Sequence, residues 1–124
     1  MITIGALGKT YNDGECITVE GEKGQCMFIV QQGNVAVVTG QDAEEIVLST
    51  LGPGDVFGEM SLFTGAPRSA TVRAKGSARV LTIDKRGFLK RVHEDPSLAF
   101  SILHKMSTRI HELNQEVARL KREK

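Results

Sequence analysis

The sequence predicts a mainly β domain, an antiparallel jelly roll (β-roll), that carries a short helix and ends in a long C-terminal helix. Glycine turns recur at short intervals through the first two-thirds of the chain, and short β-branched or alternating runs lie between them. Strands spaced in this way are typical of a sandwich or closed roll, because parallel strands need longer crossover helices between them. From Ser97 to Lys124 there is no Gly or Pro, and strong helix formers dominate.

The expected strands follow the glycine turns in order along the chain. They cover residues 16–19, 27–31, 35–39, 46–51, 70–74 and 78–84. Cys16 and Cys26 have no CxxC spacing and no clustered histidine, so neither zinc nor redox chemistry is indicated. We interpret both as small buried residues in strands.

After the last expected strand the pattern changes to helical spacing, which predicts a short helix near residues 85–94. Pro96 suits the start of the next helix. We therefore expect a β-roll over residues 1–96 and a long C-terminal helix over residues 97–124. Upstream in that helix, Leu98, Phe100 and Ile102 widen the apolar surface, and we expect them to face the roll.

The long helix carries a heptad repeat whose apolar a and d positions, here called the a/d stripe, recur at alternating spacings of three and four. The a/d stripe consists of Leu103, Met106, Ile110, Leu113, Val117 and Leu120. β-Branched residues at two of the three a positions and Leu at two of the three d positions favour a parallel two-stranded coil. Polar flanking positions favour pairing between two copies of the chain over packing on the chain's own roll. Glu116 and Lys121 occupy g and e positions that can pair across the two chains.

Composition excludes several classes of protein. The chain has 124 residues and a net charge of +1, with acids and bases interspersed, so it shows no extended nucleic-acid or membrane surface. It has no apolar run of about 18 residues that could span a bilayer. The N-terminus lacks the pattern of a signal peptide, so a cytoplasmic location is expected.

The chemistry is concentrated in residues 54–74, which read GDVFGEMSLFTGAPRSATVRA. A strand ending at Phe57 leads into a short helix through Thr64, whose N-terminus offers free N–H groups to an anion. The Arg68 guanidinium matches two phosphate oxygens, and Ser69 adds a hydroxyl donor. Glu59 would repel a bare anion, so the ligand must also present a hydroxyl donor, as a ribose does. A cyclic nucleotide combines one phosphate charge with one free ribose hydroxyl, and no motif for a di- or triphosphate is present.

This stretch closely resembles the phosphate-binding cassette of the cyclic-nucleotide-binding domain family, FGE(L/M)-(A/S)-L followed by PR-(A/S/T)-A-T-V. It is most similar to the cassettes of cyclic-AMP-dependent kinase regulatory subunits and bacterial catabolite activators. The resemblance extends to the early strands, through Tyr11, Gly14-Glu15 and Glu20-Gly21-Glu22, and to the approach at residues 51–55. It covers most of residues 8 to 110 and implies a ligand-binding module that is not an enzyme.

The resemblance assigns a role to each matched position. Glu59 takes the ribose 2′-hydroxyl, Arg68 and Ser69 take the phosphate, and Gly58 and Ala70 contribute backbone contacts, with Met60 and Ser61 in the same cassette. Leu48 and Ser49 line the base side. In this family the long helix commonly closes over the base, so the resemblance implies that residues 97–124 act as a lid and dimerisation helix. Alignment of that helix from Pro96 with the bacterial activators brings Leu113 and Asn114 to where those proteins reach adenine, so Asn114 can bond a base edge. The implied ligand set is therefore Gly58, Glu59, Met60, Ser61, Arg68, Ser69, Ala70, Leu48, Ser49 and Asn114, with no catalytic residue, metal or cofactor.

The ligand and the partners follow from the same resemblance. Threonine after the cassette arginine tends to accompany cyclic-GMP preference in this family, so Ser69 favours cyclic AMP over cyclic GMP. The family's transcription factors carry a helix-turn-helix after the long helix, whereas this sequence stops at Lys124, and about ten residues precede Tyr11 where the family usually has a helical segment. We expect a homodimer through the 103–120 heptad and no direct nucleic-acid or membrane binding by this chain.

Two other readings compete with cyclic-nucleotide binding. A degenerate β-roll could dimerise without binding nucleotide, although such a chain would be expected to have lost Glu59 or Arg68, because a buried unpaired charge is costly. A cupin-like metal enzyme needs histidines and a carboxylate inside the barrel. The three histidines, His93, His104 and His111, all lie in the helical third of the chain.

Overall fold

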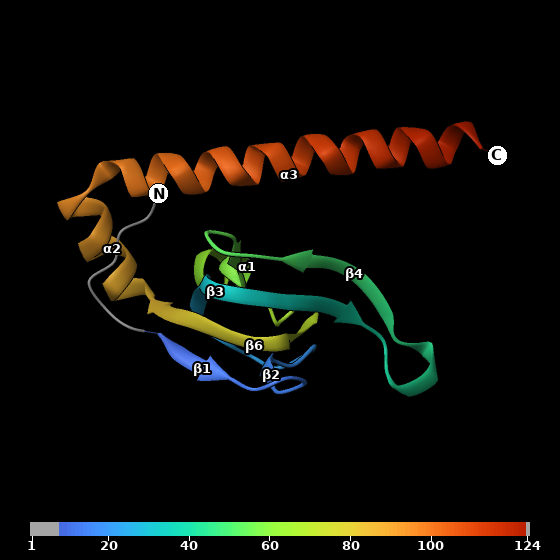
Figure 1. Ribbon diagram of the computed structural model, residues 1–124. Helices are drawn as coiled ribbons and strands as arrows, with labels where there is room; N and C mark the ends of the chain where they lie inside the picture. Colours follow the sequence, from blue (N-terminus) through green and yellow to red (C-terminus); the bar gives the residue numbers. More distant parts are fainter. Residues whose placement is uncertain (1–7, 124) are drawn as a thin grey trace. The chain divides into compact units, whose positions relative to one another are not determined.

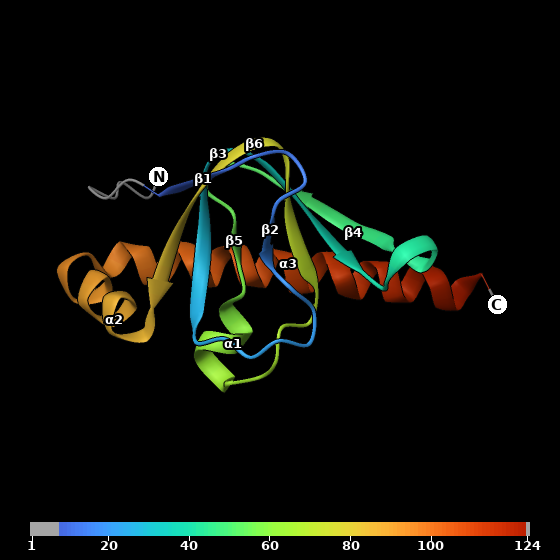
Figure 2. The same cartoon turned by 90° about the horizontal axis from the view of Figure 1, so that it is seen from below.

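The computed structural model describes residues 8–123, and their strands form one antiparallel sheet of six strands. The order β1-β6-β3-β4 is open, with β2 also pairing with β6 and β5 with β3 (Figures 1 and 2). The strands are β1 (Lys9–Tyr11), β2 (Cys16–Thr18), β3 (Cys26–Thr39), β4 (Ile46–Leu51), β5 (Val56–Phe57) and β6 (Thr71–Asp84), and a 3-10 turn η1 (Asp42–Glu44) lies between β3 and β4. The predicted fold class, antiparallel β with a short cassette helix and a long C-terminal helix, is confirmed.

The two longest strands, β3 and β6, each join segments that the sequence predicts as separate strands. Gly33 and Gly76 adopt φ angles of 75°, and the β3–β6 register shifts on both sides of Gln32. A Cβ atom on Gly33 would lie 2.2 Å from the Ser77 carbonyl oxygen. These glycines therefore bend two paired strands at bulges and do not end them.

The core of the roll lies between the bent halves of β3 and β6 and the short strand β5. Phe28 of β3 stacks on Phe57 of β5 with ring centroids 5.0 Å apart. The core cluster comprises Phe28, Val30, Val35, Phe57, Val72, Ala74, Ala78 and Val80. Phe57 is the first residue of the cassette motif, so this packing fixes where the cassette starts.

The two cysteines are less buried than expected. Cys16 is exposed and Cys26 is half-buried. Cys16 begins the three-residue strand β2, in which burial rises from the exposed Cys16 to the buried Thr18. Its side chain therefore lies outside the core, and the expectation of two buried cysteines is wrong.

Three α-helices accompany the sheet within the part of the chain that the structure describes: α1 (Glu59–Thr64), α2 (Lys85–Glu94) and α3 (Pro96–Arg122). The chain divides into two compact units, Met1–Phe88 and Leu89–Lys124, and the division falls inside α2. In the second unit Leu98 and Ile102 are buried, whereas Phe100 is 70% exposed. Leu98 and Ile102 are four residues apart and share a helix face, while Phe100 projects from a different one. The expectation that these residues face the roll stays a prediction.

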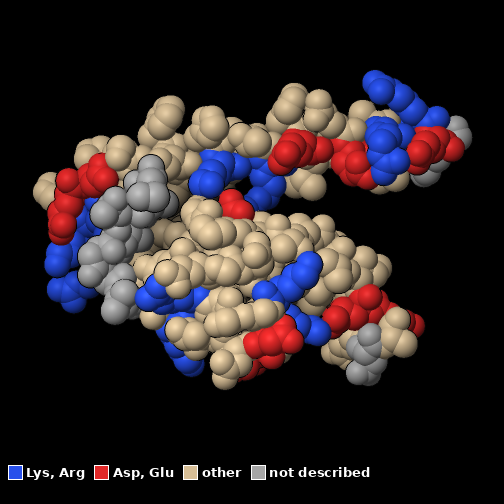
Figure 3. Space-filling model, in the orientation of Figure 1, with Lys and Arg blue, Asp and Glu red and all other residues tan. Residues whose placement is uncertain are grey.

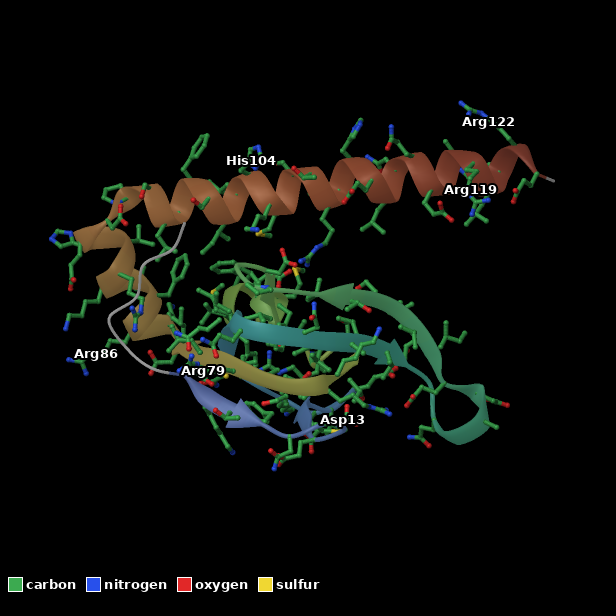
Figure 4. The ribbon with its side chains drawn as sticks, viewed as in Figure 1. Asp13, Arg79, Arg86, His104, Arg119 and Arg122 are labelled. Atoms are coloured by element: carbon green, nitrogen blue, oxygen red, sulfur yellow. The ribbon has the colours of Figure 1, made fainter. Side chains whose placement is uncertain are left out.

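The a/d stripe of α3 is largely exposed in the single chain. Five of its six members are exposed, with Met106 half-buried. Glu116 pairs within its own helix with Arg119, which also contacts Glu123 at 2.9 Å. The hydrogen bond from Arg119 lowers the pKa of the Glu116 carboxyl. Charged side chains of both signs therefore gather at the C-terminal end of α3, where Arg119 and Arg122 are labelled (Figures 3 and 4).

Candidate functional site

The cassette begins where β5 leaves the core and the backbone turns sharply into α1. Gly58 occupies the N-cap position with φ 75° and ψ 9°, in the left-handed region that favours glycine. A Cβ atom there would lie 2.7 Å from Arg68 Nη1 and 3.1 Å from the Phe28 ring. Glycine is therefore required both by the backbone angle and by the neighbouring side chains.

The short helix α1 closes on itself through local hydrogen bonds. The buried Ser61 hydroxyl donates to the Ala66 carbonyl oxygen at 2.8 Å. Gly65, also left-handed at φ 73°, donates its N–H to the Ser61 carbonyl. This C-terminal arrangement turns the chain back towards Arg68.

Arg68 is 8% exposed, and its guanidinium is held by neutral groups. Nη1 donates to the carbonyl oxygens of Cys26 at 2.9 Å and Gly58 at 3.0 Å. Nη2 donates to the Cys26 sulfur at 3.4 Å, and the guanidinium carbon lies 5.3 Å from the centre of the Phe28 ring. Through its bond to the Gly58 carbonyl, the Arg68 guanidinium is held next to Glu59, because Gly58 directly precedes Glu59 in the chain.

Glu59, the first residue of α1, is also 8% exposed. Charged side chains are rarely buried to this extent without a specific reason. The two residues that the sequence analysis singled out thus share one property: each places a largely buried charge at the start of the cassette helix.

The remaining cassette residues differ in exposure. Ser69 is exposed and Ala70 half-buried, where the chain leaves Arg68 and enters β6. Met60 is 51% exposed, and Ser61 is buried. The Ser61 hydroxyl donates its hydrogen bond to the Ala66 carbonyl oxygen, which also belongs to the cassette.

The three predicted base contacts lie outside the cassette. Leu48 and Ser49 are exposed on β4, and Leu48 falls at a register shift between β3 and β4. Asn114 is exposed on α3, in the second compact unit. Their contacts with a base stay predictions.

The structure adds two residues to this site that sequence reasoning missed. Gly24 lies just before β3, and Cys26 is the first residue of that strand. Both residues contact the Arg68 guanidinium. A glycine in a turn and a cysteine in a strand carry no signal of a binding site in a single sequence. A separate hollow of about 480 Å³ is lined by Gln25, Ser61, Leu62, Gly65, Asp84, Lys85 and Arg86, and of the predicted ligand set it includes only Ser61.

Known proteins match this chain over the same segment. The model of the cyclic nucleotide-binding domain matches residues 8–95, which is more than half of the chain. The chain belongs to the cyclic nucleotide-binding domain family. Within residues 8–123, the domain shows no cluster of three potential metal-ligating side chains. None of the helices there has the length and apolar character needed to cross a membrane.

Two curated relatives are regulators by name. The cAMP-dependent protein kinase type II regulatory subunit of Drosophila melanogaster is 36% identical over 83 residues, 66% of this chain and 22% of the relative. The cAMP-activated global transcriptional regulator CRP of Salmonella typhimurium is 32% identical over 103 residues, 82% of this chain and 49% of the relative. The chain therefore spans half or less of the length of these relatives.

Solved structures share the fold. The catabolite activator protein of Thermus thermophilus has a TM-score of 0.79 at 29% identity, covering 91% of this chain and 54% of that chain. The EAL enzyme Bd1971 has been solved in a cAMP-bound form (TM-score 0.63, 30% identity, covering 90% and 30%) and a cGMP-bound form (0.62, 32%, covering 83% and 27%). The first similarity confirms the predicted β-roll.

Proposed function

We propose that this domain binds a 3′,5′-cyclic nucleotide, cyclic AMP in preference to cyclic GMP, and acts as a non-catalytic regulatory module. The observation that carries the proposal is the pair of largely buried, oppositely charged side chains in one cassette, Glu59 and Arg68. The described acceptors of the Arg68 guanidinium are neutral, so they leave its charge to be balanced by an anion. A cyclic phosphate supplies one negative charge in the geometry that a guanidinium recognises.

The other ligand contacts complete the proposal. Glu59 accepts the ribose 2′-hydroxyl, and the exposed Ser69 adds a hydroxyl donor for the phosphate. Gly58 and Ala70 present backbone groups on either side of the cassette, with Met60 and Ser61 in its helix. Leu48, Ser49 and Asn114 face the base.

The preference for cyclic AMP is supported by two observations. Serine, not threonine, follows Arg68, and the two curated relatives carry cAMP in their names. The existence of both a cAMP-bound and a cGMP-bound form of one neighbour makes direct comparison of the two nucleotides the decisive measurement.

We further propose that the domain signals through α3 as a homodimer in the cytoplasm. The exposed a/d stripe of a 27-residue helix supports pairing with a second copy. The helix that carries this stripe also carries Asn114, the predicted base contact. Nucleotide binding at Asn114 can therefore affect the pairing of α3 with a second chain.

Isothermal titration calorimetry of the purified chain with cyclic AMP, cyclic GMP and 5′-AMP tests the proposed ligand. We expect the tightest binding for cyclic AMP. Arg68→Ala should weaken it by about 100-fold or more, since two charge-assisted hydrogen bonds contribute about 1.5–3 kcal/mol each. Arg79→Ala is the matched control, because Arg79 lies on β6 outside the cassette (Figure 4). Preferential binding of 5′-AMP contradicts the ligand class, and no binding of any nucleotide favours the degenerate roll.

A further inference from the structure

The connection between β2 and β3 runs beside Arg68 and pairs with its backbone. The Gly21 N–H donates to the Arg68 carbonyl oxygen, and the Arg68 N–H donates to the Glu22 carbonyl oxygen, both at 2.8 Å. This pairing holds the main chain of Arg68 in register with the connection. It brings Gly24, two residues further on, to the guanidinium.

Gly24 leaves the space that the guanidinium fills. A Cβ atom on Gly24 would lie 2.3 Å from Arg68 Nη2 and 2.6 Å from both Cζ and Nε. These distances are far inside van der Waals contact, and three atoms of one planar group share the clash. The guanidinium therefore lies directly against the Gly24 backbone.

The requirement for glycine at this position comes from space and not from backbone angle. Gly24 is absent from the glycines with positive φ, unlike Gly58, so an alanine there meets no left-handed backbone strain. The three heavy atoms nearest to a methyl group there all belong to Arg68. A substitution at Gly24 thus acts on Arg68 first.

The other contacts of the guanidinium fix its orientation in this space. Cys26 holds Nη1 through its carbonyl oxygen and Nη2 through its sulfur, and Gly58 holds Nη1 from the cassette side. We define these neighbours, Gly24, Cys26, Phe28 and Gly58, as the guanidinium slot. The slot joins the start of β3 to the cassette through a single side chain.

We propose that Gly24 is a positioning residue for nucleotide binding, which keeps the guanidinium slot open so that Arg68 meets the cyclic phosphate in one orientation. This inference rests on the proposed function of the same site and adds a residue outside the cassette. Filling the slot displaces the guanidinium, so the phosphate loses its paired donors while the β-roll keeps its core.

The test compares Gly24→Ala with the parent chain by calorimetry with cyclic AMP. We expect at least about a tenfold loss of affinity, the equivalent of one charge-assisted hydrogen bond. The control is Gly87→Ala, because Gly87 also lacks a positive φ and its added Cβ would meet Asp84 Oδ1 at 3.0 Å. An affinity in Gly24→Ala equal to that of the parent overturns the proposal.

A second comparison separates positioning from a general structural effect. In an Arg68→Ala background, Gly24→Ala should cause no further loss, because there is no guanidinium to displace. An equal loss in both backgrounds overturns the proposal. If Gly24→Ala does not fold, the double variant Gly24→Ala with Arg68→Lys tests the proposal instead. A folded double variant locates the clash at the Arg68 guanidinium. An unfolded double variant overturns the proposal, because Gly24 is then needed for the fold alone.

A third readout needs no nucleotide. The Arg68 Nε–H resonance of the ligand-free chain, assigned by its loss in Arg68→Ala, should move in Gly24→Ala and stay in place in Gly87→Ala. An unmoved resonance overturns the slot even if affinity falls. If the resonance moves but the parent chain binds no cyclic nucleotide, the proposed function fails and the role of Gly24 in binding fails with it, while the slot itself stands.

Discussion

Arg68 shows how a single buried charge can be tolerated and still be available to a ligand. Removing a guanidinium from water is costly unless its donors find acceptors, and carbonyl oxygens of Cys26 and Gly58 provide two. Neutral acceptors satisfy hydrogen bonds but leave the net charge in place. A buried side chain held in this way is better suited to bind an anion than one neutralised by a carboxylate.

Glu59 yields a prediction at the same scale. Glu59→Gln should weaken cyclic AMP binding by roughly 10- to 100-fold, because a carboxylate accepts the ribose hydroxyl through a charge-assisted bond of about 1.5–3 kcal/mol. Glu59→Gln and the parent chain should bind 2′-deoxy cyclic AMP about equally well, because this nucleotide has no 2′-hydroxyl to bond to residue 59 in either complex. Calorimetry with both nucleotides completes the cycle.

The control for this prediction is Glu94→Gln, which removes an exposed carboxylate from the C-terminal end of α2. It should leave both affinities unchanged. If the parent chain binds cyclic AMP and its 2′-deoxy form equally well, Glu59 does not accept the 2′-hydroxyl.

Residues of this site differed in how far the sequence could reveal them. Glu59 and Arg68 stand in one continuous, strongly patterned segment, so their type and spacing were enough to name them. Gly24 is required by the volume of a side chain that is distant in sequence, and no local pattern records that volume. Cys26 contributes mainly through its backbone carbonyl, which any residue would supply.

Among the elements, β3 and β6 explain why glycine signals misled the strand assignment. A glycine between two apolar runs predicts a turn, but a left-handed glycine also suits a bulge within a continuous strand. Only the pairing of Gln32 with Arg79 and Asn34 with Lys75 separates the two cases. By contrast, α1 and α3 were predictable because strong local signals mark their starts: Gly58 precedes α1, and Asp95 precedes α3, which begins with Pro96.

The start of α3 provides a prediction for an element. Asp95 is its N-cap: the carboxylate accepts the Ser97 N–H at 3.1 Å and the Ser97 hydroxyl at 2.5 Å. Asp95→Ala should lower the free energy of unfolding by about 1 kcal/mol, because the first turn loses its capping acceptor. Urea unfolding followed by circular dichroism at 222 nm measures the change.

The matched variant for this cap is Asp95→Asn, whose side-chain oxygen can still accept the Ser97 N–H. It should retain most of the stability of the parent chain. A loss as large as that of Asp95→Ala would show that the negative charge near the helix N-terminus, and not the capping bond, is the stabilising feature.

For the whole molecule, the division inside α2 separates two kinds of surface. The first unit holds the sheet, its core and the cassette, whereas the second carries an exposed apolar stripe on one helix. Exposed Leu, Ile and Val at heptad spacing are unusual on a solvated helix, and they support the proposed pairing of α3 with a second copy. The predicted cross-chain pair Glu116–Lys121 stays a prediction, and Glu116 would then have to share its carboxylate with Arg119.

The dimer itself is the prediction at this scale. Ile110 and Leu113 are each 58% exposed in the single chain and occupy adjacent a and d positions of the a/d stripe. Changing both to Glu should give monomers in analytical ultracentrifugation, because four apolar side chains per dimer lose burial worth at least about 1.5 kcal/mol each and the new charges repel. Thr108→Glu with Gln115→Glu is the matched control, since it adds the same two charges at exposed positions outside the stripe. That control should remain dimeric.

The contradicting outcome has two parts. If the parent chain sediments as a dimer and the Ile110→Glu, Leu113→Glu variant has the same mass, the dimer interface lies on another surface.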